Sequence, residues 1–178
     1  MAATVIINRL TGAGPTKTDI TSSNTRMSAS DDPAPGTANP VPIPGAGTNY
    51  SFWVSTRLEA TVTPDGTINN IQWYTDGTGS FGTGVTCVGQ DATAYDQASG
   101  TVGTSGDELT TGNYTTLTGA PVDVFTFDSG SPKSISGSLT NPTTGDFGNL
   151  FVYQAAVGTT ASAGASAQET FTWQYDET

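Results

Sequence analysis

The sequence predicts an all-β protein, an antiparallel β-sandwich with an extended N-terminal arm. Two features indicate the sandwich: short segments in which apolar and polar residues alternate, and turn residues between them. A third feature, a polar and proline-rich start, indicates the arm. In a chain of 178 residues with 22 glycines and 10 prolines, we place the arm at residues 1–48 and the sandwich at residues 49–178.

The predicted arm has few large apolar side chains. Residues 11–49 hold six of the ten prolines, at positions 15, 33, 35, 40, 42 and 44. Such a segment buries too little apolar surface to offset its ordering entropy, so we expect it to become ordered on a partner surface. Ala3–Asn8 is predicted to be a strand that pairs with a sheet edge of its own chain or of a neighbour. The interface candidates are Val5, Ile6, Ile7, Pro40, Pro42, Pro44 and Trp53.

The clearest strand begins at Tyr50. Its alternation places one set of side chains on a common face: Tyr50, Phe52, Val54, Leu58, Ala60 and Val62. Trp53 is out of phase with this set, so it is predicted to face the opposite side. A turn at residues 63–67 leads into Ile68–Tyr74, and the two strands are expected to form a hairpin.

Further strands are predicted along the rest of the chain. We expect weaker strands at residues 84–89 and 91–97, followed by an exposed loop at 99–107. Two pairs should follow, 122–127 with 134–139 across the turn 128–132, and 150–157 with 168–175. In the last strand Phe171, Trp173 and Tyr175 share one face, which ties this segment into a sheet. Jelly-roll and immunoglobulin-like topologies both fit this pattern.

Charge and cysteine content limit the possible partners and compartments. The formal net charge is -11, with only five basic residues to contact phosphate, which argues against nucleic acid and anionic membrane surfaces as partners. The start of the sequence does not resemble a secretory signal, and no segment is long enough to cross a bilayer. A single cysteine, Cys87, fits a reducing compartment, and its apolar neighbours favour a core position.

No residues in the sequence form a convincing catalytic or metal site. Histidine is absent, which removes the usual base of hydrolytic triads. Asp128-Ser129-Gly130 fits the aspartic protease pattern but also an ordinary turn, which we favour. Glu59, Glu108 and Glu169 do not define a glycosidase pair. Acidic turn residues such as Asp65, Asp76, Asp107 and Asp146 could bind calcium, but solvated turns fit better. We therefore expect no enzyme activity and no cofactor.

Aromatic residues could instead form a sugar-binding platform. The candidates are Trp53, Trp73, Tyr74, Trp173 and Tyr175. Packing in the core or at a subunit interface explains the same residues, and we favour packing.

Three segments together resemble virion structural proteins of tailed phages, most of all the capsid decoration, or cement, proteins: Tyr50–Leu58, Ile71–Gly77 and Phe171–Thr178. These segments are separate pieces of the chain and together make up 24 residues. It implies a β-sandwich on the capsid exterior, often trimeric, with the major capsid protein or other virion subunits as partners and with synthesis in the host cytoplasm. The alternative is a carbohydrate- or protein-binding module, as a surface or tail-fibre component.

Overall fold

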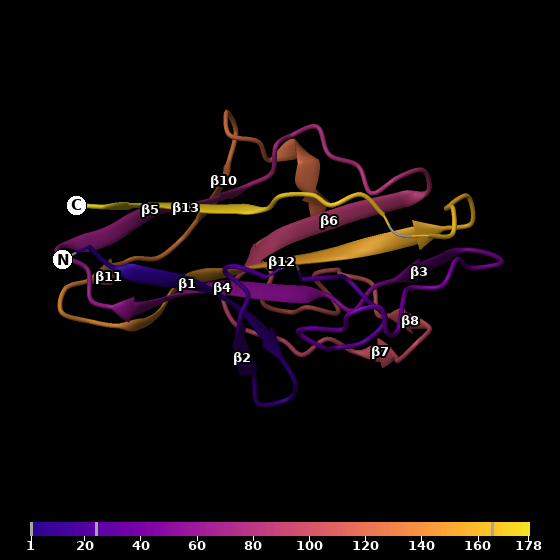
Figure 1. Ribbon diagram of the computed structural model, residues 1–178, viewed down its shortest axis with the longest axis horizontal. Helices are drawn as coiled ribbons and strands as arrows, with labels where there is room; N and C mark the ends of the chain where they lie inside the picture. Colours follow the sequence, from indigo (N-terminus) through magenta and orange to yellow (C-terminus); the bar gives the residue numbers. More distant parts are fainter. Residues whose placement is uncertain (1, 24, 165) are drawn as a thin grey trace.

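The computed structural model describes residues 2–23, 25–164 and 166–178, and within them the fold is all-β (Figure 1). The one helical element in this part of the chain is a short 3-10 turn, η1 (Val124–Thr126). The strands are β1 (Thr4–Thr11), β2 (Thr16–Asp19), β3 (Thr48–Tyr50), β4 (Val54–Val62), β5 (Thr67–Tyr74), β6 (Val85–Ala92), β7 (Gly100–Thr101), β8 (Ser105–Gly106), β9 (Val122–Asp123), β10 (Lys133–Ile135), β11 (Leu139–Thr140), β12 (Gly145–Gly158) and β13 (Thr172–Glu177).

The larger sheet, sheet A, is antiparallel and has the strand order β2-β1-β4-β12-β6-β9, with β3 also paired to β12. Strand β12 lies at its centre, because it pairs with β3, β4 and β6. The β12–β4 register shifts between Phe147 and Phe151. At this bulge Gly148 has a φ of 69°, a conformation that favours glycine over residues with a Cβ.

The smaller sheet, sheet B, is built around β5. Strands β10 and β11 pair with one edge of β5, and β13 pairs with the other. The hairpin β7–β8 forms a separate two-stranded sheet. Sheets A and B face each other, so the predicted antiparallel, sandwich-like all-β fold is confirmed.

The space between sheets A and B is filled by an aromatic core. Trp73 on β5 is 1% exposed, and its ring stacks on Phe151 of β12 at a centroid distance of 3.7 Å. Leu58, Ile68 and Ile71 are buried in the same cluster, and Trp173 and Tyr175 pack against its rim. The prediction that Phe171, Trp173 and Tyr175 tie the last strand into a sheet is therefore confirmed.

A second core covers the opposite face of sheet A. Trp53 is 2% exposed, and its ring meets that of Tyr114 edge-on at 5.4 Å. Leu10, Leu109 and Val152 belong to the same cluster. Sheet A is thus covered by sheet B on one face and, over part of the other face, by the chain between β6 and β9. Trp53 and Val54 lie in different cores, as their predicted opposite faces require, but Trp53 is buried. The predicted common face of Phe52 and Val54 is wrong, because residues 51–53 lie outside the strands and Phe52 joins Trp53 in the second core.

The N-terminal segment forms part of sheet A. Strand β1 lies between β2 and β4, in a register that runs from Thr4 opposite Val62 to Leu10 opposite Ser55. Arg9 and Leu10 are buried, as is Ala29 farther along the segment. This arrangement differs from a separate arm at residues 1–48, because apolar residues of β1 pack on the chain's own sandwich. The alternative that the first strand joins its own sheet is the one observed.

Several predicted strand pairings are wrong. Strands β4 and β5 do not form a hairpin, because β4 belongs to sheet A and β5 to sheet B. Residues 122–127 form β9 and η1 rather than one strand, and β10 pairs with β5. The last two strands also separate, since β12 lies in sheet A and β13 in sheet B. The two weak strands predicted at 84–97 are one strand, β6, that ends at Ala92.

Candidate binding surface

The predicted interface residues lie in three different environments. Val5 and Ile7 are half-buried and pack against the core between the sheets. Ile6 is half-buried on the other face of β1, and Trp53 is inside the second core. Pro40 and Pro42 are exposed and Pro44 is half-buried. Of the predicted set, the prolines therefore form the accessible surface.

These prolines lie at one end of the molecule, which we call the proline pole: residues 36–50 together with the β7–β8 hairpin. In Figure 1 this end, with β3, β7 and β8, lies opposite the two chain ends. The pole is held by hydrogen bonds. Asn39 accepts one from Ala29 N at 2.8 Å, and Asn49 donates one to the Pro42 carbonyl at 2.9 Å. Proline also restricts the backbone, so the segment has little freedom left to lose on binding.

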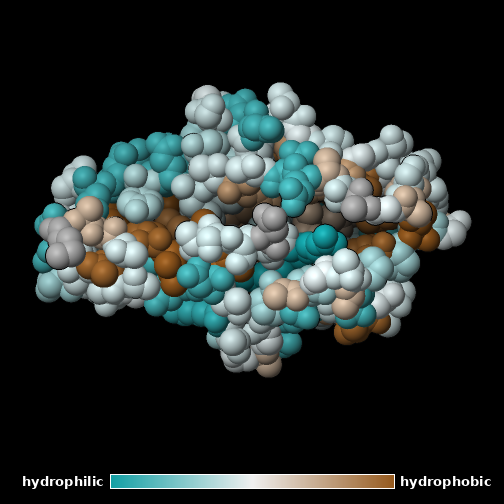
Figure 2. All heavy atoms as spheres, in the orientation of Figure 1, coloured by the Kyte–Doolittle hydropathy of each residue, from teal (hydrophilic) through white to brown (hydrophobic). Residues whose placement is uncertain are grey.

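The proline pole exposes large apolar side chains. Val102, in the β7–β8 turn, is 62% exposed and Ile43 is 38% exposed. Gly103 N, beside Val102, donates to the Ala29 carbonyl at 2.8 Å, which fixes the hairpin against the segment before the prolines. Figure 2 shows apolar residues at this end, and others at the end that carries the termini. Exposed apolar side chains on a fixed backbone suit protein contact.

An open groove of about 410 Å³ adjoins the proline pole. Its floor is the outer face of sheet A, and its lining residues are Thr48, Tyr50, Gly84, Thr86, Val88, Glu108, Leu109, Gln154, Ala156 and Gly158. Gln154 is fully buried and donates to the carbonyls of Ser51 and Asp107 at 2.6 and 2.7 Å. Burial raises the pKa of the Tyr50 hydroxyl, as does the nearby Glu108 carboxylate. The groove thus offers one aromatic ring and one carboxylate on a floor of small side chains.

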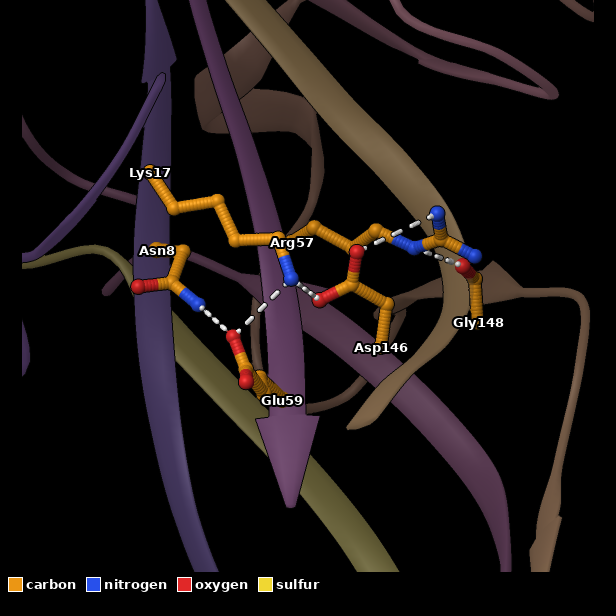
Figure 3. A network of polar contacts seen from close by, with 6 residues as sticks. All are labelled: Asn8, Lys17, Arg57, Glu59, Asp146 and Gly148. Carbon is orange, nitrogen blue, oxygen red and sulfur yellow. Dashed lines mark hydrogen bonds and ion pairs between the residues drawn. The ribbon is translucent and has the colours of Figure 1, made fainter. Parts of the chain in front are cut away.

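A polar network crosses four strands on the outer face of sheet A (Figure 3). Lys17 of β2 lies 3.1 Å from Glu59 of β4 and 2.6 Å from Asp146 of β12. Asn8 of β1 also donates to Glu59, and Arg57 Nε donates to the Gly148 carbonyl at 2.8 Å. Two of the five basic residues are therefore used to hold β2 and β12 against the sheet.

We predict that this network makes stability depend on pH in the alkaline range. The hydrogen bond to Asp146 raises the pKa of the Lys17 ammonium above its ordinary 10.5, with Glu59 adding to the effect and burial opposing it. A raised pKa means that the contribution is complete below pH 10.5 and is lost as pH rises through the higher folded-state value. Because Lys17 is exposed in part, we expect Lys17→Met to cost only about 0.5 kcal/mol near neutral pH.

The measurement is the free energy of urea unfolding of both proteins between neutral and strongly alkaline pH. The difference between wild type and Lys17→Met should shrink at alkaline pH, which separates Lys17 from the buried tyrosines that titrate in both proteins. Lys17→Arg keeps its positive charge at alkaline pH, so the difference in free energy of unfolding between Lys17→Arg and Lys17→Met should not shrink. A difference that stays constant across the range would contradict the assigned role.

Arg9 of β1 is a buried arginine on the face of sheet A that is turned toward sheet B, and it binds the segment that follows β2. Arg9 is 0% exposed, and its Nη1 donates to Thr25 Oγ1 at 2.8 Å and to the Arg26 carbonyl at 2.9 Å. Its Nε and Nη2 have no hydrogen-bond partner in the described part of the chain. Burial lowers the pKa of this guanidinium, although Tyr153 and Asp31 oppose the effect. Arg9 therefore fixes the segment after β2 to β1.

Many aspartates serve to shape turns. Asp19, Asp32, Asp76, Asp123 and Asp128 each accept a hydrogen bond from the backbone N–H two residues later. This is the Asx-turn pattern. The turn predicted for Asp128-Ser129-Gly130 is confirmed, since one Asp128 oxygen accepts from both Gly130 N and Ser131 N at 2.8 Å.

The predicted calcium candidates are likewise bound within the protein. Asp76 closes its turn, Asp107 accepts from Ser99 Oγ at 2.6 Å, and Asp146 binds Lys17. Within residues 2–23, 25–164 and 166–178, no three side chains of His, Cys, Asp or Glu are grouped as for a metal ion. Cys87 is 1% exposed, and burial raises the pKa of its thiol. The predicted core position of Cys87 is confirmed.

The predicted aromatic platform is not assembled at the surface. Trp53 and Trp73 are buried in different cores, and Trp173 packs at the rim of the inter-sheet core. Tyr50 was assigned to a common face with Val54 and Leu58 and was missed as a groove residue. Glu108 was considered only as one member of a carboxylate pair. No sequence signal places these two residues together, because their contact depends on how β3 meets the chain after β8.

No helix among the described residues is both long enough and apolar enough to cross a membrane. Comparison with known protein families, with curated proteins and with solved structures gives no significant match to this chain.

Proposed function

We propose that the chain is a virion structural protein, a capsid decoration protein that attaches to the outer capsid surface through its proline pole. The observation that carries the proposal is the Pro40–Pro44 segment, which is fixed by hydrogen bonds through Asn39 and Asn49 and exposes Pro40, Pro42 and Ile43, at the same end of the molecule as exposed Val102. A preordered apolar surface can bind a subunit with a small loss of conformational entropy. The partner would be the major capsid protein or another virion subunit.

The charge distribution supports a protein partner. Four of the five basic residues are used inside the protein: Arg9 is buried, Lys17 and Arg57 hold the polar network, and Lys133 binds Asp91. A surface with so few free cations is unsuited to nucleic acid or to an anionic membrane.

The binding test uses capsids of the phage whose gene cluster encodes the chain. Wild-type protein should sediment with these capsids and occupy regular sites in electron cryomicroscopy. The double variant Ile43→Ser/Val102→Ser should lose most of this binding, because it removes apolar contact from the proline pole. Val62→Ser is the matched control, since Val62 is 37% exposed but lies at the end of β4 away from this pole. Equal binding by all three proteins would contradict the assigned surface, and no binding by wild type would contradict the function.

Self-association belongs to the same proposal, and a trimer is the state that the resemblance implies. Strand β13 is an edge strand of sheet B, paired only with β5 among the described strands, and such an edge can pair with another chain. Native mass spectrometry of the free protein and of protein released intact from particles should show trimers. Monomers in both samples would contradict this part.

The groove beside the pole favours one second candidate, a carbohydrate-binding module. Tyr50 supplies a ring and Glu108 a hydrogen-bond acceptor, the two contacts that sugars need most. A glycan array should then give a signal that Tyr50→Ala removes while capsid binding is unaffected.

A further inference from the structure

Three side chains from three strands meet at one carboxyl group where the sheets face each other. Lys133 Nζ, from β10 of sheet B, lies 2.9 Å from Asp91 Oδ1 of β6. Asn149 Nδ2, from β12, donates to Asp91 Oδ2 at 3.2 Å. Asp91 is only 4% exposed. One carboxyl group therefore holds a primary amine on one oxygen and a primary amide on the other.

The group lies at the edge of the inter-sheet core, with Asp91 buried and Lys133 and Asn149 half-buried. Asp91 lies opposite Phe151, which is 0% exposed, in the β6–β12 register. Lys133 Nζ lies 6.0 Å from the centroid of the Phe127 ring. Asn149 follows Gly148 in the bulge of β12, and its backbone N–H donates to the Ser136 carbonyl at 2.8 Å. This last bond holds the Asn149 backbone close to the end of β10, the strand that carries Lys133.

We propose that Lys133 and Asn149 condense to form an intramolecular isopeptide bond, with Asp91 as the group that transfers the protons. The neutral Lys133 amine attacks the Asn149 side-chain carbonyl carbon, a new carbon–nitrogen bond forms, and the bond from that carbon to Nδ2 breaks. One molecule of ammonia leaves. No oxidant, reductant or cofactor is required, because an amine and a primary amide become a secondary amide and ammonia.

Asp91 has three side-chain partners, because Thr118 Oγ1 donates to Oδ1 as well. The contacts with Lys133 and Asn149 match the two proton transfers that this reaction needs. Oδ1 lies beside the nitrogen that must lose a proton on attack, and Oδ2 already accepts from the nitrogen that must gain one to leave. In the resting state the pair is ionised. Burial would raise the pKa of Asp91, but hydrogen bonds from Thr118, Lys133 and Asn149 outweigh it and place that pKa below its ordinary value. The reactive neutral pair forms by moving one proton along the 2.9 Å contact.

An ordinary ion pair, with the Asn149 amide satisfying the second oxygen of a buried carboxylate, would use the same contacts. Placing the amide nitrogen there orients the leaving group toward its proton donor, which is the positioning that accelerates such condensations. The flexible stem of Lys133 lets Nζ move from the carboxyl toward the Asn149 side chain, which is bound to the other oxygen of the same group. The proposed isopeptide bond does not depend on the proposed attachment of the protein to a capsid.

The test is the mass of the purified full-length protein after prolonged incubation at neutral pH. We expect wild type to be lighter than its sequence mass by one ammonia. After chymotryptic cleavage between the two positions, for instance after Leu139 or Phe147, the peptides that carry Lys133 and Asn149 should remain joined. The joined peptides distinguish an isopeptide bond from a cyclic imide at asparagine, which also loses ammonia but leaves the peptides separate.

The variants Lys133→Arg, Asn149→Ala and Asp91→Asn should each have the full sequence mass and give separate peptides. Asp146→Asn, which changes a carboxylate in the outer polar network, should still form the bond. Circular dichroism shows which variants fold, and the peptide map of wild type decides the question even if Asp91→Asn does not. Wild type with its full sequence mass and separate peptides overturns the proposal and leaves a plain ion pair.

Discussion

Deletion of residues 1–48 is expected to leave the remaining chain unfolded. The deletion removes β1 and β2, exposes the edge of β4 and opens both cores, because Arg9 is buried on one face of sheet A and Leu10 on the other. It also removes Ala29, which is 0% exposed. The stabilisation that is lost with several fully buried side chains exceeds the free energy of unfolding of a typical domain, about 5–15 kcal/mol.

Circular dichroism and urea unfolding of residues 49–178 check this expectation. The control is Pro40→Ala/Pro42→Ala in the full chain, which alters two exposed residues of the same segment and should change the free energy of unfolding by less than about 1 kcal/mol. A cooperative unfolding transition of residues 49–178 alone would show that the sandwich is independent of its first 48 residues.

Trp73→Ala is expected to cost about 3–5 kcal/mol of stability. Trp73 is 1% exposed, and its ring contacts those of Phe151, Phe171 and Phe127 at centroid distances of 3.7, 5.0 and 6.4 Å. The substitution therefore leaves a large cavity between the two sheets, in a core whose aromatic rings cannot close it by small shifts.

Trp173→Ala is the matched control for this change. Trp173 lies opposite Trp73 in the β13–β5 register but is only partly buried at the rim of the core, so its loss should cost clearly less. Both values come from urea unfolding monitored by circular dichroism. Equal costs for the two variants would contradict the view that Trp73 is the centre of the inter-sheet core.

The sequence predicted where strands occur better than it predicted which strands pair with each other. Alternation is a local property, and Ile68–Tyr74 does form a strand. The strand predicted to begin at Tyr50 is interrupted at residues 51–53, so that Tyr50 ends β3 and β4 begins at Val54. Pairing is decided by contacts distant in the sequence. The turn at residues 63–67 looked like a hairpin turn, yet it carries the chain from sheet A to sheet B, because Leu58 and Ile68 fill the same core from opposite sheets. No short-range pattern distinguishes these two uses of a turn.

Burial explains why only part of the predicted interface set is accessible. Pro40 and Pro42 are exposed and Pro44 is half-buried, in keeping with a polar, proline-rich segment at the surface. Trp53 was assigned to an interface because it faces away from Val54, an inference that holds only if the second face of sheet A is open. Tyr114 and Leu109, about 60 residues later, cover that face. Likewise, Asp91, Lys133 and Asn149 are too far apart in sequence to suggest a group.

The two ends of the described chain lie together, at the end of the molecule away from the proline pole (Figure 1). The Glu177 carboxylate accepts hydrogen bonds from Ala3 N at 3.0 Å and from Asp65 N at 2.6 Å, and the Thr178 backbone pairs with Thr67. A short glycine linker could therefore join the ends, with new ends opened between Pro40 and Pro44, to give a circular permutant. It also follows that a peptide fused to either end would project from the side opposite the proline pole, which makes this scaffold suited to display.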